Sequence, residues 1–472
     1  MQKSKMIFTI GPSSDNEDTI REFIKNGMST ARLNFSHGTH ESHKKVIEKI
    51  SSIRKELRRS TGILADIKGP KIRLGAFSSL KIELHKGDVF SFSCEDDELI
   101  GDEDMCVVSY KELYKEVKPF DIILVDDGLM EFRVLEIKDK DIVCEALTNG
   151  VISDHKGVSV PNIKIGLPAI TEKDKKDLAF IAQNVVDFVA ASFVRKPSDI
   201  LEYKAILKSH GRDDIKVIAK IESTEGIENI DKIIEVSDGI MIARGDMGVE
   251  IPVEKVPLVQ KTIIEKCNKA NKIVITATQM LDSMIRNPRP TRAEITDVAN
   301  AILDGSDAIM LSGESASGLY PIDAVKTMGK IAKDAEKYLD FHKTMEKFKD
   351  EELNSFNELI SFSVIEAISK SDIKAIVVKM TSRGDKVKNI SKYRPKSPIL
   401  AITSDESLAR SISLEFGVIP VVESGVTLEN LEEFSRDLVL KKGFGKKGDS
   451  ILVVSEGKDK HGNNSTLKFE TI

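Results

Sequence analysis

The segment KVIAKIE (residues 216–222) is an apolar run rich in β-branched residues, and GIMIARG (residues 239–245) repeats it after one intervening helical pattern. Such runs are typical of strands that are buried on both faces and pair in parallel through helical crossovers. Further runs of this kind stand at residues 6–11, 29–35, 62–68, 188–194, 273–278 and 307–313. Eight strand–helix units with right-handed crossovers are the number that closes a (β/α)₈ TIM barrel.

Residues 70–165 interrupt this alternation between the third strand and the helical pattern that begins at Thr171. This interval predicts a small all-β domain, because short alternating strands stand at residues 81–84, 89–93, 122–125, 129–137 and 142–147, with a hairpin turn at 138–141. An insertion at the carboxyl end of a barrel strand lies at the catalytic end. We therefore expect a β-barrel-like lid over the active site.

A second α/β block follows a polar helical stretch near residues 334–352. Its predicted strands, at residues 373–379, 399–403, 418–422, 450–454 and 466–469, indicate an open sheet. The predicted fold class is thus α/β, with a TIM barrel (residues 1–69 and 166–345), an inserted lid (70–165) and a C-terminal open α/β sheet domain (346–472). A length of 472 residues suits about three domains.

The composition excludes several classes of protein. Seventy Lys plus Arg against 76 Asp plus Glu leave a net charge of −6, which disfavours non-specific binding to nucleic acid or to an anionic membrane. No uncharged apolar run approaches the ~18 residues of a membrane span, and the N-terminus lacks the apolar segment of a signal peptide. The four cysteines are far apart, so we expect neither a disulfide scaffold nor a zinc site. These features predict a cytoplasmic chain.

Three local patterns carry structural expectations only. Ser14 and Glu17 are expected to form a capping box at the first helix, and the basic segment 54–59 to be a solvated helix end. The GxGxxG match at residues 443–448 follows a helix and precedes a strand, which is the reverse of a dinucleotide-binding turn. His37, His40 and His43 are spread around a helix by their spacing, so a shared metal is not expected.

Polar residues stand at the predicted strand ends, where a barrel enzyme forms its active site. Lys220 and Glu222 lie in an otherwise apolar strand. A buried ion pair is the structural alternative, but desolvation makes it costly. Glu222 and Asp246 fall at the same level of adjacent strands, and two carboxylates suit Mg²⁺. Together with Arg32, Thr278 and Ser312 they provide the cations and hydroxyls that phosphoryl transfer requires.

Over essentially its whole length the chain resembles the pyruvate kinase family. The motifs that carry the resemblance are TIGPS (9–13), RLNFSHG (32–38), KGP (68–70), KIE (220–222), ARGDMG (243–248), TQM (278–280), RPTRAE (289–294) and SGESA (312–316). The resemblance implies Mg²⁺- or Mn²⁺-dependent transfer of the phosphoryl group of phosphoenolpyruvate to ADP. The products would be ATP and pyruvate, in the final step of glycolysis.

The resemblance also implies a role for individual residues. Lys220 would stabilise the transferring phosphoryl group, and Glu222 with Asp246 would hold the divalent cation. Phosphoenolpyruvate would meet Arg32, Lys220, Gly245, Asp246 and Thr278, and the nucleotide would meet Asn34, Phe35, Ser36, His37, Arg73 and Lys156. Thr278 and Ser312 are both candidates for the relay that protonates the enolate, and the sequence does not rank them.

A monovalent cation site would use Asn34, Ser36, Asp66 and the Ile67 carbonyl. Potassium-dependent members of the family carry a glutamate where this chain has Lys71. The permanent ammonium of Lys71 can supply the charge that K⁺ would bring. We therefore hypothesise that activity does not require potassium.

The C-terminal sheet resembles the regulatory domain of the family. The resemblance implies an effector phosphate, from a sugar phosphate or a nucleotide, on Thr381, Ser382 and Arg383, although Asp385 brings a like charge toward it. It also implies a homotetramer. Two alternatives remain: a catalytically silent metabolite sensor, which should lack Lys220, Glu222 or Asp246, and another Mg²⁺-dependent barrel enzyme that acts on phosphoenolpyruvate or pyruvate.

Overall fold

A closed barrel of eight parallel strands forms the centre of the computed structural model, which describes residues 2–95, 99–346, 348, 355–380, 384–459 and 462–472. Around the barrel the strand order is β1–β17–β16–β15–β14–β13–β3–β2. The strands are β1 (Lys5–Thr9), β2 (Met28–Asn34), β3 (Gly62–Asp66), β13 (Phe188–Ala191), β14 (Lys216–Ile221), β15 (Gly239–Ala243), β16 (Ile273–Ala277) and β17 (Ala308–Leu311). The predicted TIM barrel is confirmed, and each strand ends one to three residues before its apolar run does.

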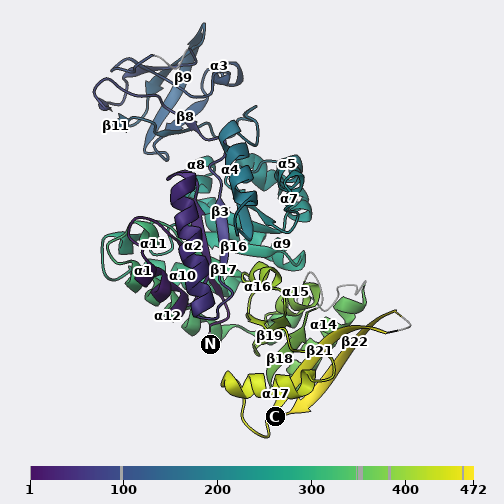
Figure 1. Cartoon of the computed structure of the whole chain (residues 1–472). Coiled ribbons are helices and arrows are strands. Elements are labelled where there is room, and N and C mark those ends of the chain that lie inside the picture. Colours follow the sequence, from purple (N-terminus) through teal and green to yellow (C-terminus); the bar gives the residue numbers. More distant parts are fainter. Residues whose placement is uncertain (1, 96–98, 347, 349–354, 381–383, 460–461) are drawn as a thin grey trace.

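Helices surround the barrel on its outer side (Figure 1). The longer ones are α1 (Glu17–Lys25), α2 (His40–Glu56), α4 (Glu172–Ala182), α5 (Pro197–Ser209), α9 (Val256–Lys269), α10 (Arg292–Asp304) and α12 (Pro321–Ala335). Shorter ones are α6 (Thr224–Glu228), α7 (Ile230–Val236), α8 (Arg244–Glu250), α11 (Gly313–Ala316) and the 3₁₀ turns η1 (Val253–Lys255), η2 (Asp282–Ile285) and η3 (Glu336–Tyr338). Helix α13 (Phe341–Glu346) instead packs against the core of the C-terminal domain through Phe341.

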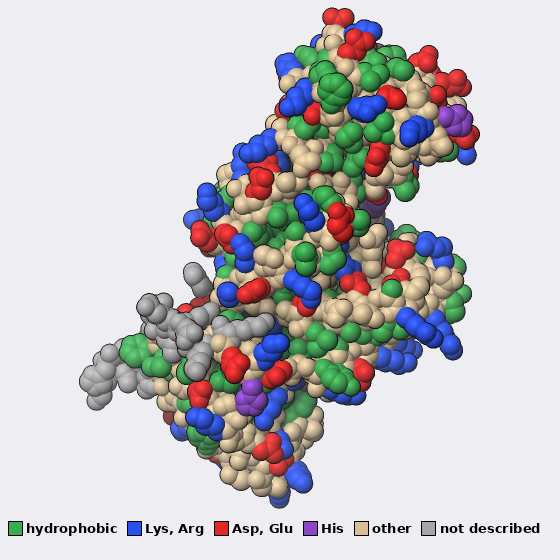
Figure 2. Space-filling view, turned by 180° about the vertical axis from the view of Figure 1, so that it is seen from behind, with side chains coloured by type: hydrophobic (Ala, Val, Ile, Leu, Met, Phe, Trp, Pro, Cys, Tyr) green, Lys and Arg blue, Asp and Glu red, His purple; other side chains and the backbone are tan. Residues whose placement is uncertain are grey.

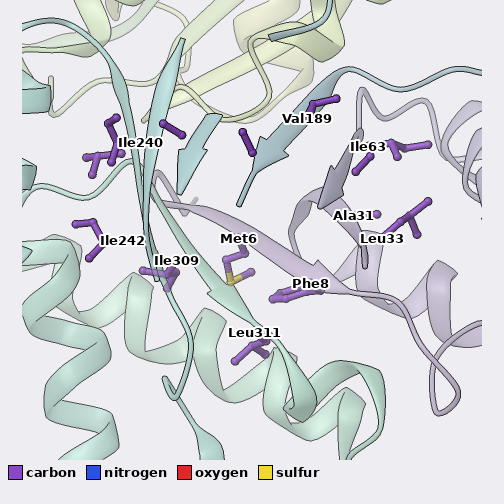
Figure 3. Packing of buried hydrophobic residues seen from close by; sticks show 14 of the residues in the cluster. Met6, Phe8, Ala31, Leu33, Ile63, Val189, Ile240, Ile242, Ile309 and Leu311 are labelled. Atoms are coloured by element: carbon purple, nitrogen blue, oxygen red, sulfur yellow. The ribbon is translucent and has the colours of Figure 1, made fainter. Parts of the chain in front are cut away.

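Successive strand residues face opposite sides of the barrel wall, which explains why the runs are apolar throughout. Met6 and Phe8 belong to the cluster that packs against the helices, and Ile7 between them belongs to the cluster inside the barrel. Figure 3 shows the outer cluster, with side chains from β1, β2, β3, β13, β15 and β17. The inner cluster also includes Leu414 of the C-terminal domain.

One local expectation is wrong, and a second is wrong only for Arg54, since Lys55, Arg58 and Arg59 are exposed as expected. Helix α1 begins at Glu17 and is capped by Asn16, whose side chain accepts a hydrogen bond from the Thr19 amide at 2.9 Å. Ser14 does not cap this helix, because the helix begins further along the chain. Its side chain accepts a hydrogen bond from the Gly11 amide instead. In the last turn of α2, Arg54 is buried and donates to the Thr61 carbonyl at 2.8 Å. This part of the basic segment is therefore not solvated.

The inserted domain is an all-β lid that extends from one end of the barrel (Figure 1). Its main sheet has the order β4–β12–β8–β9–β10–β6–β7, and β11 pairs with β5. The five predicted strands are confirmed as β5 (Lys81–Leu84), β6 (Val89–Ser93), β8 (Ile122–Val125), β9 (Met130–Lys138) and β10 (Asp141–Ala146). The sequence did not predict β4 (Ile72–Arg73), β7 (Met105–Val107) or β12 (Gly157–Ser159), which have two or three residues, too few for a periodic pattern to show. It also did not predict β11 (Gly150–Ser153), which begins with a glycine, or the short helix α3 (Leu113–Glu116).

The C-terminal domain is a five-stranded sheet in the order β20–β19–β18–β21–β22. Its strands are β18 (Ile373–Lys379), β19 (Ile399–Thr403), β20 (Val418–Val422), β21 (Ser450–Asp459) and β22 (Gly462–Thr471). Its helices are α14 (Phe356–Lys370), α15 (Asp385–Ser391), α16 (Glu406–Ser411) and α17 (Leu431–Lys441). The loop at residues 443–448 ends α17 and leads into β21, as expected. The domain boundaries stay predictions.

Two further features agree with the composition. All four cysteines are free and buried. Within the described ranges, no helix has the length and the apolar character that crossing a membrane requires. Figure 2 shows basic and acidic side chains interspersed over the visible face of the molecule.

Candidate active site

Lys220 is the centre of a buried cluster of charges at the carboxyl end of the barrel strands. It lies near the end of β14, and its Nζ atom is 3.0 Å from Glu222 Oε1, 3.3 Å from Asp66 Oδ1 and 2.8 Å from Ser192 Oγ. Burial acts to lower the pKa of Lys220, but the charges of Asp66 and Glu222 outweigh it and raise the pKa above its usual value. The side chain is therefore an ammonium ion.

Asp66, at the end of β3, bridges Lys220 to a second cation. Arg32 Nε lies 2.7 Å from Asp66 Oδ2, and a terminal nitrogen of Arg32 donates to Thr9 Oγ1 at 2.9 Å. The register of β2 and β3 places Asn34 opposite Asp66, which sets Arg32 two residues deeper in the barrel wall. Burial acts to raise the pKa of Asp66, yet Lys220 and Arg32 lower it overall. Two cations thus converge on one carboxylate.

Glu222 and Asp246 lie on neighbouring strand ends, as predicted. Glu222 is buried, and its Oε2 atom accepts a hydrogen bond from the Phe193 amide at 2.6 Å. Burial raises the pKa of Glu222, Lys220 opposes this, and the nearby Asp246 adds to the increase. Two carboxylates this close together repel each other unless a cation or a proton lies between them. Their oxygen donors therefore fit a hard divalent cation that takes its other ligands from water and substrate.

Lys71 contacts this carboxylate pair. Its Nζ atom is 2.8 Å from Asp246 Oδ1 and 3.4 Å from Asp127 Oδ1 of the lid. Burial acts to raise the pKa of Asp246, but Lys71 and Lys220 lower it overall. The resemblance implied that the Lys71 ammonium lies close to the monovalent site. In the structure this ammonium contacts the carboxylate of Asp246.

Three of the four groups expected at a monovalent site, those of Asn34, Asp66 and Ile67, already have hydrogen-bond or ion-pair partners. Asn34 Oδ1 accepts from the Ser36 amide at 3.1 Å, and the Ile67 carbonyl accepts from Ser192 Oγ at 2.6 Å. Asp66 uses one oxygen for Arg32 and the other for Lys220.

Thr278 follows β16 in a strained conformation. Its φ is 70° and that of Gln279 is 54°, in the left-handed region that a β-branched residue rarely adopts. Thr278 Oγ1 accepts from the Gly245 amide at 2.9 Å, and its carbonyl accepts from Arg244 at 2.6 Å. These bonds hold Thr278 against the segment that carries Asp246. Such strain costs about 1–3 kcal/mol and is concentrated at functional sites.

Ser312, the second hydroxyl candidate, follows β17. Its amide donates to Glu314 Oε2 at 2.8 Å. Its own Oγ is buried and has no hydrogen-bond partner among the described residues. An unpartnered buried hydroxyl at a strand end is consistent with a group that bonds to a ligand.

The expected nucleotide residues fall into two groups. Phe35 is buried and stacks on His43 with ring centroids 4.2 Å apart, and His37 is exposed beside it. Arg73 and Lys156 lie together on the lid, where Arg73 donates to the His155 carbonyl at 2.9 Å and Lys156 pairs with Asp126 at 2.9 Å. Neither lid residue contacts the Lys220 cluster within the part of the chain described.

The three histidines of the second strand end have separate partners. His40 contacts Asp177 at 2.7 Å, and His43 Nε2 contacts the His37 carbonyl at 2.9 Å.

The expected effector residues Thr381, Ser382 and Arg383 lie outside the described residues.

The sequence analysis missed Thr9, Ser192, Phe193 and Glu250. Ser192 directly follows β13, and this strand-end position was the available signal. Thr9 is the last residue of β1 and carries the same signal. Burial raises the pKa of Glu250, at the end of α8, to about 7, with Asp246 and Glu222 contributing. Phe193 acts through its backbone amide, which no sequence pattern reveals.

Comparisons with known proteins follow the same division of the chain. The family model for the pyruvate kinase barrel domain matches residues 1–325, and that for the pyruvate kinase alpha/beta domain matches residues 358–469. A pyruvate kinase of Clostridium perfringens is 56% identical over the whole of both chains. One from Clostridium acetobutylicum is 48% identical over 96% of each chain, and one from Bacillus licheniformis is 46% identical over all of this chain and 81% of its own length.

These matches cover the residues that build the Lys220 cluster as well as the C-terminal sheet. They do not favour a different barrel enzyme that acts on phosphoenolpyruvate or pyruvate. The chain belongs to the pyruvate kinase family.

Proposed function

We propose that the carboxyl end of the barrel transfers the phosphoryl group of phosphoenolpyruvate to ADP. The bond between phosphorus and the enol oxygen breaks, a bond from phosphorus to an oxygen of the β-phosphate of ADP forms, and the enolate takes up a proton to become pyruvate. One observation carries the proposal: the Lys220 ammonium lies between Asp66 and Glu222, beside the Arg32 pair. The names of the relatives support it, and a role in the final step of glycolysis would place the chain in the cytoplasm.

Arg32 and Lys220 bind and neutralise the phosphoryl group in this proposal. Both are cations held rigidly by Asp66, so little reorganisation is needed when charge develops on the phosphoryl oxygens. Gly245 and Asp246 lie in the first turn of helix α8 and would meet the substrate there, although the Gly245 amide at present donates to Thr278 Oγ1. Thr278 contacts this segment directly.

Glu222 and Asp246 would hold Mg²⁺ or Mn²⁺. When bound, the cation supplies Lewis-acid neutralisation of the phosphoryl and carboxylate oxygens of the substrate. Lys71 neutralises Asp246 from the lid side, because its ammonium contacts that carboxylate at 2.8 Å.

Lys71 also supports the hypothesis of potassium-independent activity. The reason differs from the one based on the resemblance: the extra positive charge lies on Asp246 rather than among Asn34, Ser36, Asp66 and Ile67. The test compares rates in K⁺-free and K⁺-rich buffer for the natural chain and for Lys71→Glu. We expect the natural chain to be insensitive and the variant to gain activation by K⁺; strong activation of the natural chain would contradict the hypothesis.

Thr278 and Ser312 remain the two candidates for the proton relay. Exchange of the methyl hydrogens of pyruvate with solvent deuterium reports protonation of the enolate separately from phosphoryl transfer. The variant of the relay residue, Thr278→Ala or Ser312→Ala, should lose this exchange more than it loses phosphoryl transfer.

The lid residues Arg73 and Lys156, together with residues 34–37, would bind the nucleotide. Binding requires Lys156 to exchange its present partner Asp126 for a phosphate. A homotetramer and a sugar-phosphate or nucleotide effector at residues 381–383 are further proposals, which sedimentation and activity titrations test.

A coupled assay tests the function itself. ATP formation from phosphoenolpyruvate and ADP should require Mg²⁺ or Mn²⁺ and should be abolished in Glu222→Gln. A chain that binds both substrates without forming ATP would be the silent sensor and would overturn the proposal.

A further inference from the structure

A cavity of about 890 Å³ lies between the barrel and the C-terminal domain, at the end of the barrel opposite to Lys220. The last turn of α2 and the segment that follows it, down to Ser60, form the barrel side. The other side comes from α16, the end of β20, and α17 with the residue after it. In Figure 1, α2 runs from the lid side of the barrel toward the C-terminal domain. A volume of several hundred Å³ suits a small-molecule ligand.

The lining of this cavity is strongly basic in a chain whose net charge is −6. Seven Lys and Arg side chains line it, against three carboxylates. Five of the cations have no carboxylate within ion-pair distance among the described residues: Lys55, Arg58, Arg59, Lys441 and Lys442. The neighbouring Glu56 does not compensate them, because it pairs with Arg21 at 2.9 Å.

The uncompensated cations come from both sides of the cavity. Burial together with the positive charges of Arg59 and Lys441 lowers the pKa of Lys442. Arg59 belongs to the barrel side and Lys442 to the C-terminal side, so like charges from the two domains repel each other across the cavity. A ligand with several negative charges would remove this repulsion.

Two more guanidinium groups form the inner wall. Arg410 Nε contacts Asp187 Oδ1 at 2.8 Å, and a terminal nitrogen of Arg54 is 4.0 Å from Asp187 Oδ2. Arg410 also pairs with Glu406 Oε2 at 3.8 Å, so these two arginines face two carboxylates, and the excess positive charge of the lining comes from the five uncompensated cations. Apolar groups, including Phe434 and Leu438 of α17, line another part of the cavity and provide a surface for the organic body of a ligand.

We propose that this cavity binds a small molecule that carries two or more phosphate groups. Phosphate matches the fork of donors on Arg58 and Arg59 and the point charges of Lys441 and Lys442. More than one phosphate is needed because one phosphate group carries at most about two negative charges, whereas five uncompensated cations line the cavity. A nucleic acid or a membrane fits less well, since basic and acidic side chains are interspersed over the visible face of the molecule (Figure 2).

The test titrates the full-length chain with inorganic triphosphate by calorimetry, without divalent metal and at fixed ionic strength. The test variant is Arg59→Gln/Lys442→Gln, with one change on each wall. The matched control is Lys326→Gln/Lys330→Gln, which removes two exposed charges from α12 outside the cavity. We expect the affinity to fall at least about tenfold in the test variant and to be unchanged in the control.

A further variant, Arg58→Gly, tests whether weaker triphosphate binding could result from a loss of folding. Arg58 has φ of 50°, where glycine is favoured, so this change removes a charge and also relieves backbone strain. We expect weaker triphosphate binding with no loss of thermal stability. Triphosphate could also bind at the catalytic end. Such binding would persist in the test variant, whose turnover of phosphoenolpyruvate and ADP should stay normal, and it is thereby distinguished from binding in the cavity.

Titrations with two further ligands distinguish between classes of phosphate compound. Orthophosphate should bind at least about tenfold more weakly than triphosphate, because its charge balances fewer of the five uncompensated cations. A sugar bisphosphate that binds more tightly than triphosphate would show that the apolar wall is used. Equal triphosphate affinity in the natural chain and in the test variant would overturn the proposal, as would an equal loss in the control.

Discussion

The two ends of the barrel both bury basic side chains but stabilise them by different means. At the catalytic end, Lys220 contacts two carboxylates, and its pKa is raised. At the opposite end, Lys5 and Lys216 donate to backbone carbonyl groups of the C-terminal domain, and Lys216 also lies 3.7 Å from the carboxylate of Glu415. Burial lowers the pKa of each of these two lysines to about 8.

The carboxylates at the opposite end are used for assembly rather than for a ligand. Asp307 accepts a hydrogen bond from the Val274 amide and pairs with Arg394, and Asp187 accepts from the Ile63 amide and pairs with Arg410. Each aspartate therefore joins a barrel strand to the C-terminal domain. Two carboxylates in contact thus keep Lys220 cationic for chemistry, whereas burial by a neighbouring domain disfavours the charge of Lys5 and Lys216.

The largest expected effect separates two lysines of the same strand. Lys220→Met should lower kcat at least about a thousandfold, because it removes a preorganised cation from the phosphoryl site. Lys216→Met, at the other end of β14, is the control and should retain most activity. Steady-state kinetics on both variants, with circular dichroism to confirm folding, make the measurement. Near-normal turnover in Lys220→Met would remove the functional distinction between the two ends.

Breaking the Arg394–Asp307 pair should cost the most stability. Arg394→Ala leaves Asp307 buried without its cation, which is expected to lower the free energy of unfolding by about 3–5 kcal/mol. The control is Arg436→Ala, whose pair with Glu470 is partly exposed and should contribute less than about 1 kcal/mol. Chemical denaturation compares the two. Equal losses would show that the ion pair to the barrel is not special.

The lysines at the opposite end predict a pH dependence with a definite sign. The folded-state pKa of Lys216 is lowered from 10.5 to about 8, so the unfolded chain binds more protons between these values. Stability contributed by this group therefore rises as the pH increases from about 8 to about 10.5, by up to about 3 kcal/mol. Unfolding of the natural chain and of Lys216→Met across this range should diverge accordingly. Parallel curves would contradict the assignment.

The smallest expected effect concerns strain at the catalytic end. Thr278→Gly should be more stable than Thr278→Ala by about 1 kcal/mol, because only glycine adopts a φ near 70° without cost. Both variants remove the hydroxyl, so their difference reports the backbone alone. Thermal unfolding supplies the measurement, and an equal stability of the two would mean that the conformation at this position is not strained.

The barrel was predictable because burial on both faces makes each strand a continuous apolar run. Lys220 and Glu222 were predictable for the same reason, since charged residues stand out in such a run. The lid strands β4, β7 and β12 have two or three residues, which is too few for an alternating pattern to show, and β11 begins with Gly150, a residue type that strands disfavour.

The contacts that complete the site could not be predicted, because they join distant segments. Lys71 reaches Asp246 across 175 residues of sequence, and Lys220 reaches Ser192 across 28. Arg54 was expected to be solvated, and its burial depends on Thr61 and on Asp187. Spacing within one element reports which face a residue occupies, but it does not report what the next element places against that face.

The position of Leu414 inside the barrel has a consequence for biosynthesis. This side chain packs in the same interior cluster as Ile7, and the Gly417 amide donates to the Lys3 carbonyl at 2.9 Å. A ribosome therefore makes the first strand of the barrel long before it makes the residue that closes the barrel beneath it. During translation the apolar surface at this open end of the barrel is exposed until the last domain emerges. Exposed apolar surface of this kind favours the binding of chaperones to the nascent chain.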